Sequence, residues 1–152
     1  MKERLISFTD DMQQASRDGR KGQIRRVVKL IDPRHHRIDI EDGVVKESTR
    51  INGCWHVVKV HKCPYGVVGD RLRSDDLLLE ITGLRVERLQ EITPDDACAE
   101  GIELSDYDKG SANSASKYVP MFRDLWDSIY AEKHPWKSNP FVWVIEFKRI
   151  DK

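Results

Sequence analysis

The residues best suited to chemistry lie in one short basic segment near the amino end of the chain. Between Arg17 and Arg37 the sequence contains eight Lys or Arg residues and only two acidic ones. The cations nearest its centre are Arg20, Lys21, Arg25 and Arg26. Gly19 precedes them and is suited to end a helix, so they would stand on a tight turn that enters a strand. Such a turn can present guanidinium and backbone N–H groups to a phosphate or a base edge. A solvated basic loop is an equally simple interpretation.

This basic character is local, because the chain as a whole is neutral. It carries 26 Lys and Arg residues against 26 Asp and Glu residues. The acidic residues gather later, around Glu91–Asp96 and Glu100–Asp108. A basic face on a neutral protein suits a short anionic ligand better than a long duplex.

Tyr65 is the aromatic residue with the best case for contacting a ligand. It lies between Pro64 and Gly66, in an expected loop, where an aromatic ring can stack on a base. Packing on the rim of the fold is an equally good explanation. Trp126 and Trp143 lie within apolar repeats, so we expect them in the core.

Two Cys/His pairs have the spacing of zinc ligands. They are Cys54-x-His56 and His61-x-Cys63. The residues between the pairs form no turn, and in one continuous strand the pairs face opposite sides. We therefore expect no metal site. No Gly-rich phosphate loop is present either, so no cofactor is expected.

Short strands separated by turns must position these side chains. Pro33, Asp42-Gly43 and Asn52-Gly53 are turn signals. Gly83 interrupts the strongest strand pattern as a bulge or bend. The expected strands cover about residues 25–31, 37–40, 44–47, 54–60, 71–73, 77–81, 84–89 and 141–149.

Helices are expected at three places. One begins after Thr9 and one after Thr93, each with a capping hydroxyl followed by acidic residues. Pro120 is expected to begin the third, whose inner face is Phe122, Leu125, Trp126, Ile129 and Tyr130. A polar surface loop covers about residues 105–119. The pattern predicts an α+β fold, a small antiparallel barrel with two or three flanking helices.

Length and composition favour one domain over residues 1–152. Three cysteines are a poor basis for a disulfide framework and point to a reducing compartment. No apolar run approaches the roughly 18 residues of a membrane span. We therefore expect a cytoplasmic protein that does not enter membranes.

The basic segment resembles a known family signature. Gly19-x-Lys21-x-x-x-x-Arg26 is similar to the ASCH signature, Gly-x-Lys-x-x-Glu-x-Arg. The wider layout resembles a phage and prophage branch of the ASCH family. Blocks that carry this resemblance include Cys63-Pro64-Tyr65-Gly66, Gly69-Asp70-Arg71-Leu72 and Asn139-Pro140-x-Val142-Trp143.

The resemblance implies a PUA-like barrel with a cleft beside the signature turn, and RNA or a modified nucleoside as its ligand. The nucleic-acid-binding residues would then be Arg20, Lys21, Arg25, Arg26, Tyr65 and Arg71. The chain departs from the phage branch after Leu72. It passes directly to Leu77, where that branch carries a long insertion, so a ligand preference set by the insertion is not inherited.

One branch of the family hydrolyses the amide of N(4)-acetylcytidine with a lysine, a threonine and a glutamate. The lysine falls on Lys21 and the glutamate on Glu100, whereas the threonine falls on Ile24. Isoleucine has no hydroxyl, so Lys21 or Glu100 would have to activate water alone. An amidohydrolase using this candidate catalytic pair is thus the second hypothesis, with a ribonuclease as its variant. The third is a phage structural or interaction protein that binds a phage or host protein.

Overall fold

The computed structural model describes residues 1–32 and 34–150, and its centre is a five-stranded sheet. The strand order is β1 (Glu3–Leu5), β6 (Arg71–Ser74), β7 (Leu77–Arg88), β8 (Phe141–Arg149) and β2 (Gln23–Val27). Neighbouring strands are antiparallel, except that β1 runs parallel to β6. The expected α+β class is confirmed.

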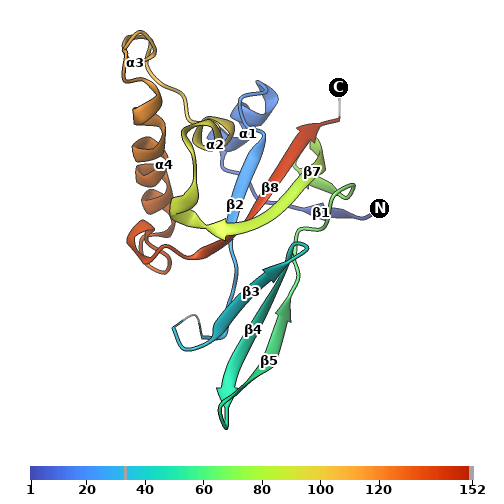
Figure 1. The fold of residues 1–152 in the computed structure, drawn as a ribbon. Coiled ribbons are helices and arrows are strands. Elements are labelled where there is room, and N and C mark those ends of the chain that lie inside the picture. Colours follow the sequence, from blue (N-terminus) through green and yellow to red (C-terminus); the bar gives the residue numbers. More distant parts are fainter. Residues whose placement is uncertain (33, 151–152) are drawn as a thin grey trace.

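The sheet is strongly curved but is not a closed barrel (Figure 1). β1 and β2 are its two edges, and in the described part of the chain no ladder joins them. The expected barrel is therefore open. The reason lies at the amino end, where β1 has three residues and the chain then leaves the sheet for a helix. A side-chain contact links the two edges instead, because a guanidinium N–H of Arg26 donates to the carbonyl oxygen of Ser7 over 2.8 Å.

β7 is a single long strand where two shorter strands were expected. Its register against β8 shifts between Ile81 and Gly83, so the predicted irregularity at Gly83 is confirmed. A Cβ atom on Gly83 would lie 2.5 Å from a carboxylate oxygen of Glu146. The strand therefore passes through this position because glycine leaves room for the neighbouring carboxylate.

A second sheet of three strands projects from the body (Figure 1). It comprises β3 (Arg37–Glu41), β4 (Val44–Ile51) and β5 (Cys54–His61), in that order. We call it the arm. Its two turns are the predicted Asp42-Gly43 and Asn52-Gly53 pairs, in which all four residues have positive φ. This backbone conformation joins antiparallel strands through two residues. The turn expected at Pro33 lies outside the described residues.

Two helices begin where their capping residues predict. α1 (Asp10–Arg17) follows Thr9, whose side chain accepts an N–H hydrogen bond from Met12. α2 (Pro94–Ala99) follows Thr93, whose hydroxyl and backbone N–H form a reciprocal capping pair with Asp96. The short helices η1 (Leu89–Glu91) and η2 (Trp136–Ser138) flank the later strands.

The segment 105–119 differs from the expected loop. It contains the short helix α3 (Asp106–Lys109) and the first residues of α4 (Ala115–Tyr130), so Pro120 lies inside the last helix rather than at its start. The expected inner face begins at Phe122, but Tyr118 and Val119 before Pro120 also pack against the core. Of that expected face Phe122 and Trp126 are buried, whereas Leu125 and Ile129 are exposed. Among the described helices none is long and apolar enough to cross a membrane.

The core has two parts, one on each side of the large sheet. Leu72, Leu79, Ile81, Trp143 and Ile145 belong to the first, and all are almost fully buried. In the second, α4 packs Phe122 and Trp126 against the β8 residues Val142 and Val144. The expectation that Trp126 and Trp143 belong to the core is confirmed.

Candidate functional site

The structure brings Lys21 and Glu100 into direct contact. Lys21 lies between α1 and β2, and Glu100 is the residue that ends α2. The two residues form an isolated antiparallel bridge. The Lys21 ammonium donates to Glu100 Oε2 over 3.0 Å and to the Glu100 carbonyl oxygen over 2.9 Å. Their side chains are 1% and 5% exposed, so this is a buried ion pair.

Arg25 holds the second oxygen of the same carboxylate. One terminal nitrogen donates to Glu100 Oε1 over 2.9 Å and to the side-chain oxygen of Gln23 over 2.9 Å. The other donates to Glu87 over 2.8 Å. The Arg25 side chain is fully buried, and its Nε has no hydrogen-bond partner among the described residues. Glu100 is thus shared by two cations that stand on opposite sides of it.

Further charges surround this cluster at the surface of the sheet. Asp96 accepts from Gln23 over 3.0 Å and pairs with Arg85 over 3.3 Å. Burial alone would raise the pKa of Asp96, but the donors around it hold the pKa below its usual range. Burial would lower the pKa of Arg85, and the carboxylates of Glu87, Asp96 and Glu146 raise it instead. The positive charges of the signature turn are therefore largely compensated within the protein.

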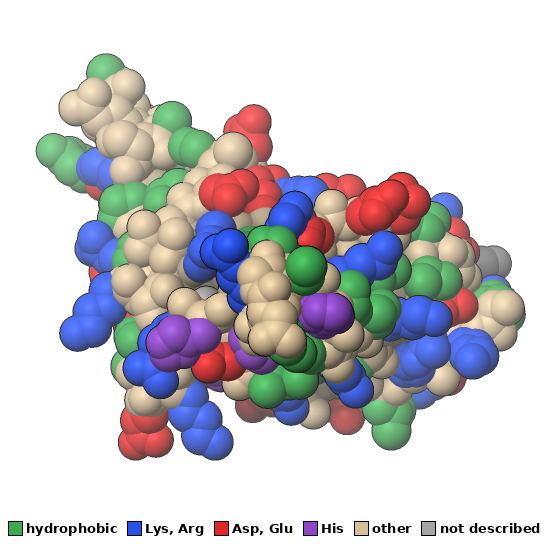
Figure 2. Space-filling view, turned by 60° about the horizontal axis from the view of Figure 1, so that its bottom comes forward, with side chains coloured by type: hydrophobic (Ala, Val, Ile, Leu, Met, Phe, Trp, Pro, Cys, Tyr) green, Lys and Arg blue, Asp and Glu red, His purple; other side chains and the backbone are tan. Residues whose placement is uncertain are grey.

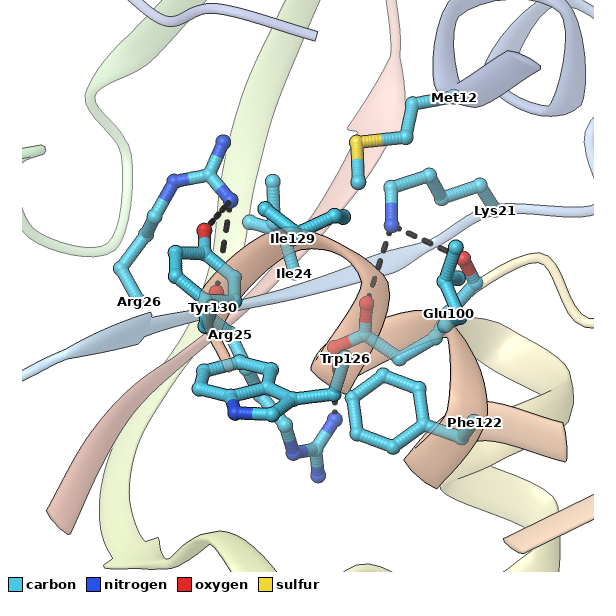
Figure 3. Close-up of a pocket in the computed structure, with 11 residues that line it drawn as sticks. Met12, Lys21, Ile24, Arg25, Arg26, Glu100, Phe122, Trp126, Ile129 and Tyr130 are labelled. Carbon is cyan, nitrogen blue, oxygen red and sulfur yellow. Dashed lines mark hydrogen bonds and ion pairs between the residues drawn. The ribbon is translucent and has the colours of Figure 1, made fainter. Parts of the chain in front are cut away.

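The cavity that Lys21 and Glu100 line together is too small for a nucleoside, and a neighbouring hollow of about 270 Å³ is lined by Glu100 but not by Lys21. The cavity has a volume of about 20 Å³, which is room for about one water molecule. Phe122, Trp126 and Ile129 of α4 close it on one side, and Met12 and Ile24 line it on the other (Figure 3). The expected catalytic pair is adjacent but covered by the helix.

Three larger hollows lie at the other end of β2. Their volumes are about 470, 490 and 320 Å³, and all three are lined by Val27 and Lys29. We call them together the Lys29 groove. The first lies against the end of α4, the second extends towards Arg88 and Phe141, and the third towards Lys62 and Tyr65.

The Lys and Arg side chains that line the groove have no compensating acid among the described residues, whereas His61 contacts the Glu47 carboxylate over 2.8 Å. Its Lys and Arg residues are Arg26, Lys29, Arg34, Lys62, Arg88 and Lys133, together with His61 and His134. Of the described residues that line it, none is Asp or Glu. No ion pair to a described residue involves any of these six Lys and Arg side chains, whereas Arg4, Arg20, Arg73 and Arg85 elsewhere are all paired. The positive charge of the groove is therefore directed outwards. Figure 2 looks onto this end of the molecule and shows Lys, Arg and His side chains gathered around the arm.

Aromatic rings accompany the cations of the groove. Phe8, Tyr65 and Tyr130 line the 470 Å³ hollow. The Tyr130 hydroxyl accepts from Arg26 over 3.2 Å, which fixes the guanidinium at the border between the groove and the buried cluster. In the second hollow the Arg88 guanidinium lies 4.0 Å from the centre of the Phe141 ring. These rings are half-buried, and single-stranded nucleic acids contact combinations of cations and aromatic rings.

The expected nucleic-acid-binding residues fall into three places. Lys21 and Arg25 are in the buried cluster, whereas Arg26 and Tyr65 line the groove. Arg20 is half-buried beside Asp18 and Glu103, with which it forms ion pairs. Arg71 is on β6 near the far edge of the sheet and lines none of the hollows described above.

Several groove residues were not predicted. Lys29 and Arg34 belong to the basic segment, so the sequence showed their charge but not that they would line a groove. Lys62 is three residues from Tyr65, whereas Arg88 and Lys133 come from distant parts of the chain. One sequence signal was available, because no acidic residue occurs between Glu47 and Asp70.

Comparison with known proteins adds information on the fold. No family model and no curated protein matches the chain. Three solved structures are similar over 97–99% of it. The first is hypothetical protein PH0355, with 14% sequence identity, all of that chain covered and a TM-score of 0.45. The second is an ASCH domain from Lactobacillus crispatus JV V101, with 12% identity, 79% of that chain covered and a TM-score of 0.48. The third is protein EF3133 from Enterococcus faecalis V583, described with the family model DUF984, with 12% identity, 81% of that chain covered and a TM-score of 0.52.

The similarity to EF3133 is the one among these three whose TM-score exceeds 0.5. At 12% identity it concerns the arrangement of helices and strands. The chain is therefore an α+β protein that shares its fold with the Enterococcus faecalis protein EF3133.

Proposed function

We propose that this chain is an ASCH-type domain that binds single-stranded RNA, or a modified nucleoside within it, in the Lys29 groove. The observation that carries the proposal is the charge of the groove. Six Lys and Arg side chains line three adjoining hollows and form no ion pair with described residues, in a protein of zero net charge. Such a concentration of uncompensated charge attracts a polyanion.

The size and lining of the groove support a single strand as the ligand. The first hollow, of about 470 Å³, is within the range of small-ligand sites and has three aromatic side chains around it. An unpaired base stacks on such rings, while the neighbouring phosphates contact cations. The bases of a duplex are already stacked on one another, so they are not available to these rings.

In this proposal the signature turn has a supporting role. Lys21 and Arg25 are neutralised by Glu100 and its neighbours, and they fix the start of β2. The other end of β2 then places Val27, and Lys29 just beyond it, in the groove. Arg26 is the signature cation that contributes to the groove directly.

Fluorescence anisotropy with a labelled oligouridine tests the proposal. The wild-type chain should bind it saturably at low salt, and Lys29→Glu should weaken binding at least tenfold. Lys109→Glu is the matched control, because Lys109 is exposed and lies on α3, at the end of the molecule away from the arm (Figure 1). No binding at low salt, or equal loss in both variants, would refute the proposal, because electrostatic affinity is strongest there.

The contact between Lys21 and Glu100 favours one alternative, an amidohydrolase for N(4)-acetylcytidine-like nucleosides. The cavity that both residues line has a volume of about 20 Å³, and the hollow of about 270 Å³ beside Glu100 is not lined by Lys21, so α4 would have to move before such a substrate could contact both residues. Water would replace the hydroxyl that Ile24 lacks. Release of acetate from N(4)-acetylcytidine by the wild type, abolished in Lys21→Met and in Glu100→Gln, would support this activity.

A further inference from the structure

We propose that the arm extends the RNA-binding surface, so that a strand held in the Lys29 groove continues along β5 to Trp55. This inference rests on the proposed function, since it assigns a second part to the same site. Residues 54–60 of β5 line none of the three hollows that form the Lys29 groove.

The first observation is the charge of the segment that forms the surface. Residues 48–69 include the end of β4, all of β5 and the loop that carries Tyr65. All 26 acidic residues of the chain lie outside this segment. Its charged residues are Arg50, Lys59 and Lys62, and its histidines are His56 and His61. A polyanion can thus follow the whole segment without meeting a carboxylate that belongs to it.

The second observation is the exposure of β5. Seven of its eight residues are exposed, although four of them are valine or tryptophan. β5 is also one of the two edge strands of the arm, and in the described part of the chain no strand pairs with its free edge. An apolar strand with a free edge is a surface that a partner covers.

The third observation is an aromatic platform near the tip of the arm. Trp55 is 46% exposed, and the Arg37 guanidinium lies 5.9 Å from its ring centre. Arg50 is the cross-strand partner of Trp55 in the ladder between β4 and β5. Arg37 also pairs with Asp39 over 3.1 Å, so the exposed indole offers a base a stacking face, and Arg50 is the cation beside it for an adjacent phosphate.

The arm and the groove are connected along the chain. β5 ends at His61, and the following residue, Lys62, lines the groove together with Tyr65. From Trp55 to Lys62 an extended strand covers about 23 Å. An RNA of several nucleotides is needed to contact both ends, so the arm should contribute to long ligands and not to short ones.

Charge also argues against a second copy of the chain as the occupant. Antiparallel pairing of two β5 edges would bring two Lys59 side chains onto one ribbon, with no acidic residue in either strand to compensate them. RNA supplies the missing negative charge and also stacks on the aromatic ring.

The test compares two oligouridines, of about four and about twelve nucleotides, by anisotropy. Trp55→Ala should weaken binding of the longer RNA by about 5- to 150-fold, the range for loss of one stacked base, and leave the shorter one unchanged. Tyr107→Ala is the matched control, because Tyr107 is another exposed ring beside a cation, Lys117, but lies on α3. It should change neither affinity.

The outcomes separate the two proposals. Lys29→Glu should weaken both RNAs; if it weakens neither, the groove fails as the site and the arm fails with it. If Lys29→Glu acts but Trp55→Ala binds the longer RNA like the wild type, the inference about the arm alone is overturned. It is also overturned if Trp55→Ala converts a dimer into a monomer in light scattering, because the arm would then be a subunit interface.

Discussion

Replacing Lys21 by methionine tests whether the signature lysine is a structural residue. Methionine keeps much of the side-chain length but removes the ammonium that donates to Glu100 over 3.0 and 2.9 Å. Removing one partner of a buried ion pair costs about 3–5 kcal/mol, because the other charge remains buried without compensation. Arg25 still donates to Glu100 over 2.9 Å, so we expect the lower end, about 3 kcal/mol.

Urea unfolding followed by tryptophan fluorescence measures this loss, since Trp126 and Trp143 are buried in the two parts of the core. At a slope of about 1–3 kcal/mol per molar urea, the midpoint should fall by about 1–3 M with the slope unchanged. Lys29→Met is the matched control and should stay within about 0.5 kcal/mol, because Lys29 is exposed.

A double-mutant cycle with Glu100→Gln isolates the pair. The combined variant should be less destabilised than the sum of the single variants by at least about 1 kcal/mol, because both partners are removed together. A loss below about 1 kcal/mol in Lys21→Met, or strict additivity in the cycle, would refute the view that this pair fixes the start of β2.

Three further predictions concern pH, backbone and salt. Burial would raise the pKa of Glu47, but two backbone N–H groups and two histidines hold the pKa at about 2. The ionised Glu47 carboxylate should therefore add about 3 kcal/mol to the free energy of unfolding above pH 4.5, and this contribution should disappear as the pH falls towards 2. If urea unfolding still shows a difference in stability between wild type and Glu47→Gln at pH 2, this prediction is contradicted. Gly66→Ala should lower the free energy of unfolding by about 1–3 kcal/mol, because its φ is 120° and a Cβ would lie 2.8 Å from an oxygen of Asp70. Gly53→Ala, also at positive φ but with no atom within 4 Å of the added Cβ, should cost less in thermal unfolding. For RNA binding, a plot of the logarithm of the association constant against the logarithm of the salt concentration should have a slope of about −4 if each of the six groove cations contacts one phosphate. Lys29→Ala should make this slope shallower by about 0.7. An unchanged slope would exclude Lys29 from phosphate contact.

Local signals predicted much of the fold. The strand Phe141–Arg149 was expected with the bounds that it has, because proline precedes it and apolar residues alternate along it. Thr93 and the two Asx-Gly turns were likewise readable from single residues. β1 was missed because three residues cannot show a period, and it is a strand only through its pairing with β6.

The site was less predictable, because it depends on distant contacts. The pairing of Lys21 with Glu100 followed from a family resemblance, since 79 residues separate them. The basic turn was expected to face a ligand, whereas Glu100 and Glu87 approach from other elements and neutralise Lys21 and Arg25. Local sequence shows where cations are, but not which of them folding will pair with an acid.

The unpaired edge of β5 also has a consequence for handling the protein. Lys59 is the one Lys or Arg residue in β5, and charged side chains on such a strand are what keep it from recruiting further strands into aggregates. In about 1 M salt the screening length falls to about 3 Å, and this protection weakens. Concentrated samples should therefore keep best in dilute buffer, and a second lysine at Val57, which is 57% exposed, should improve their solubility.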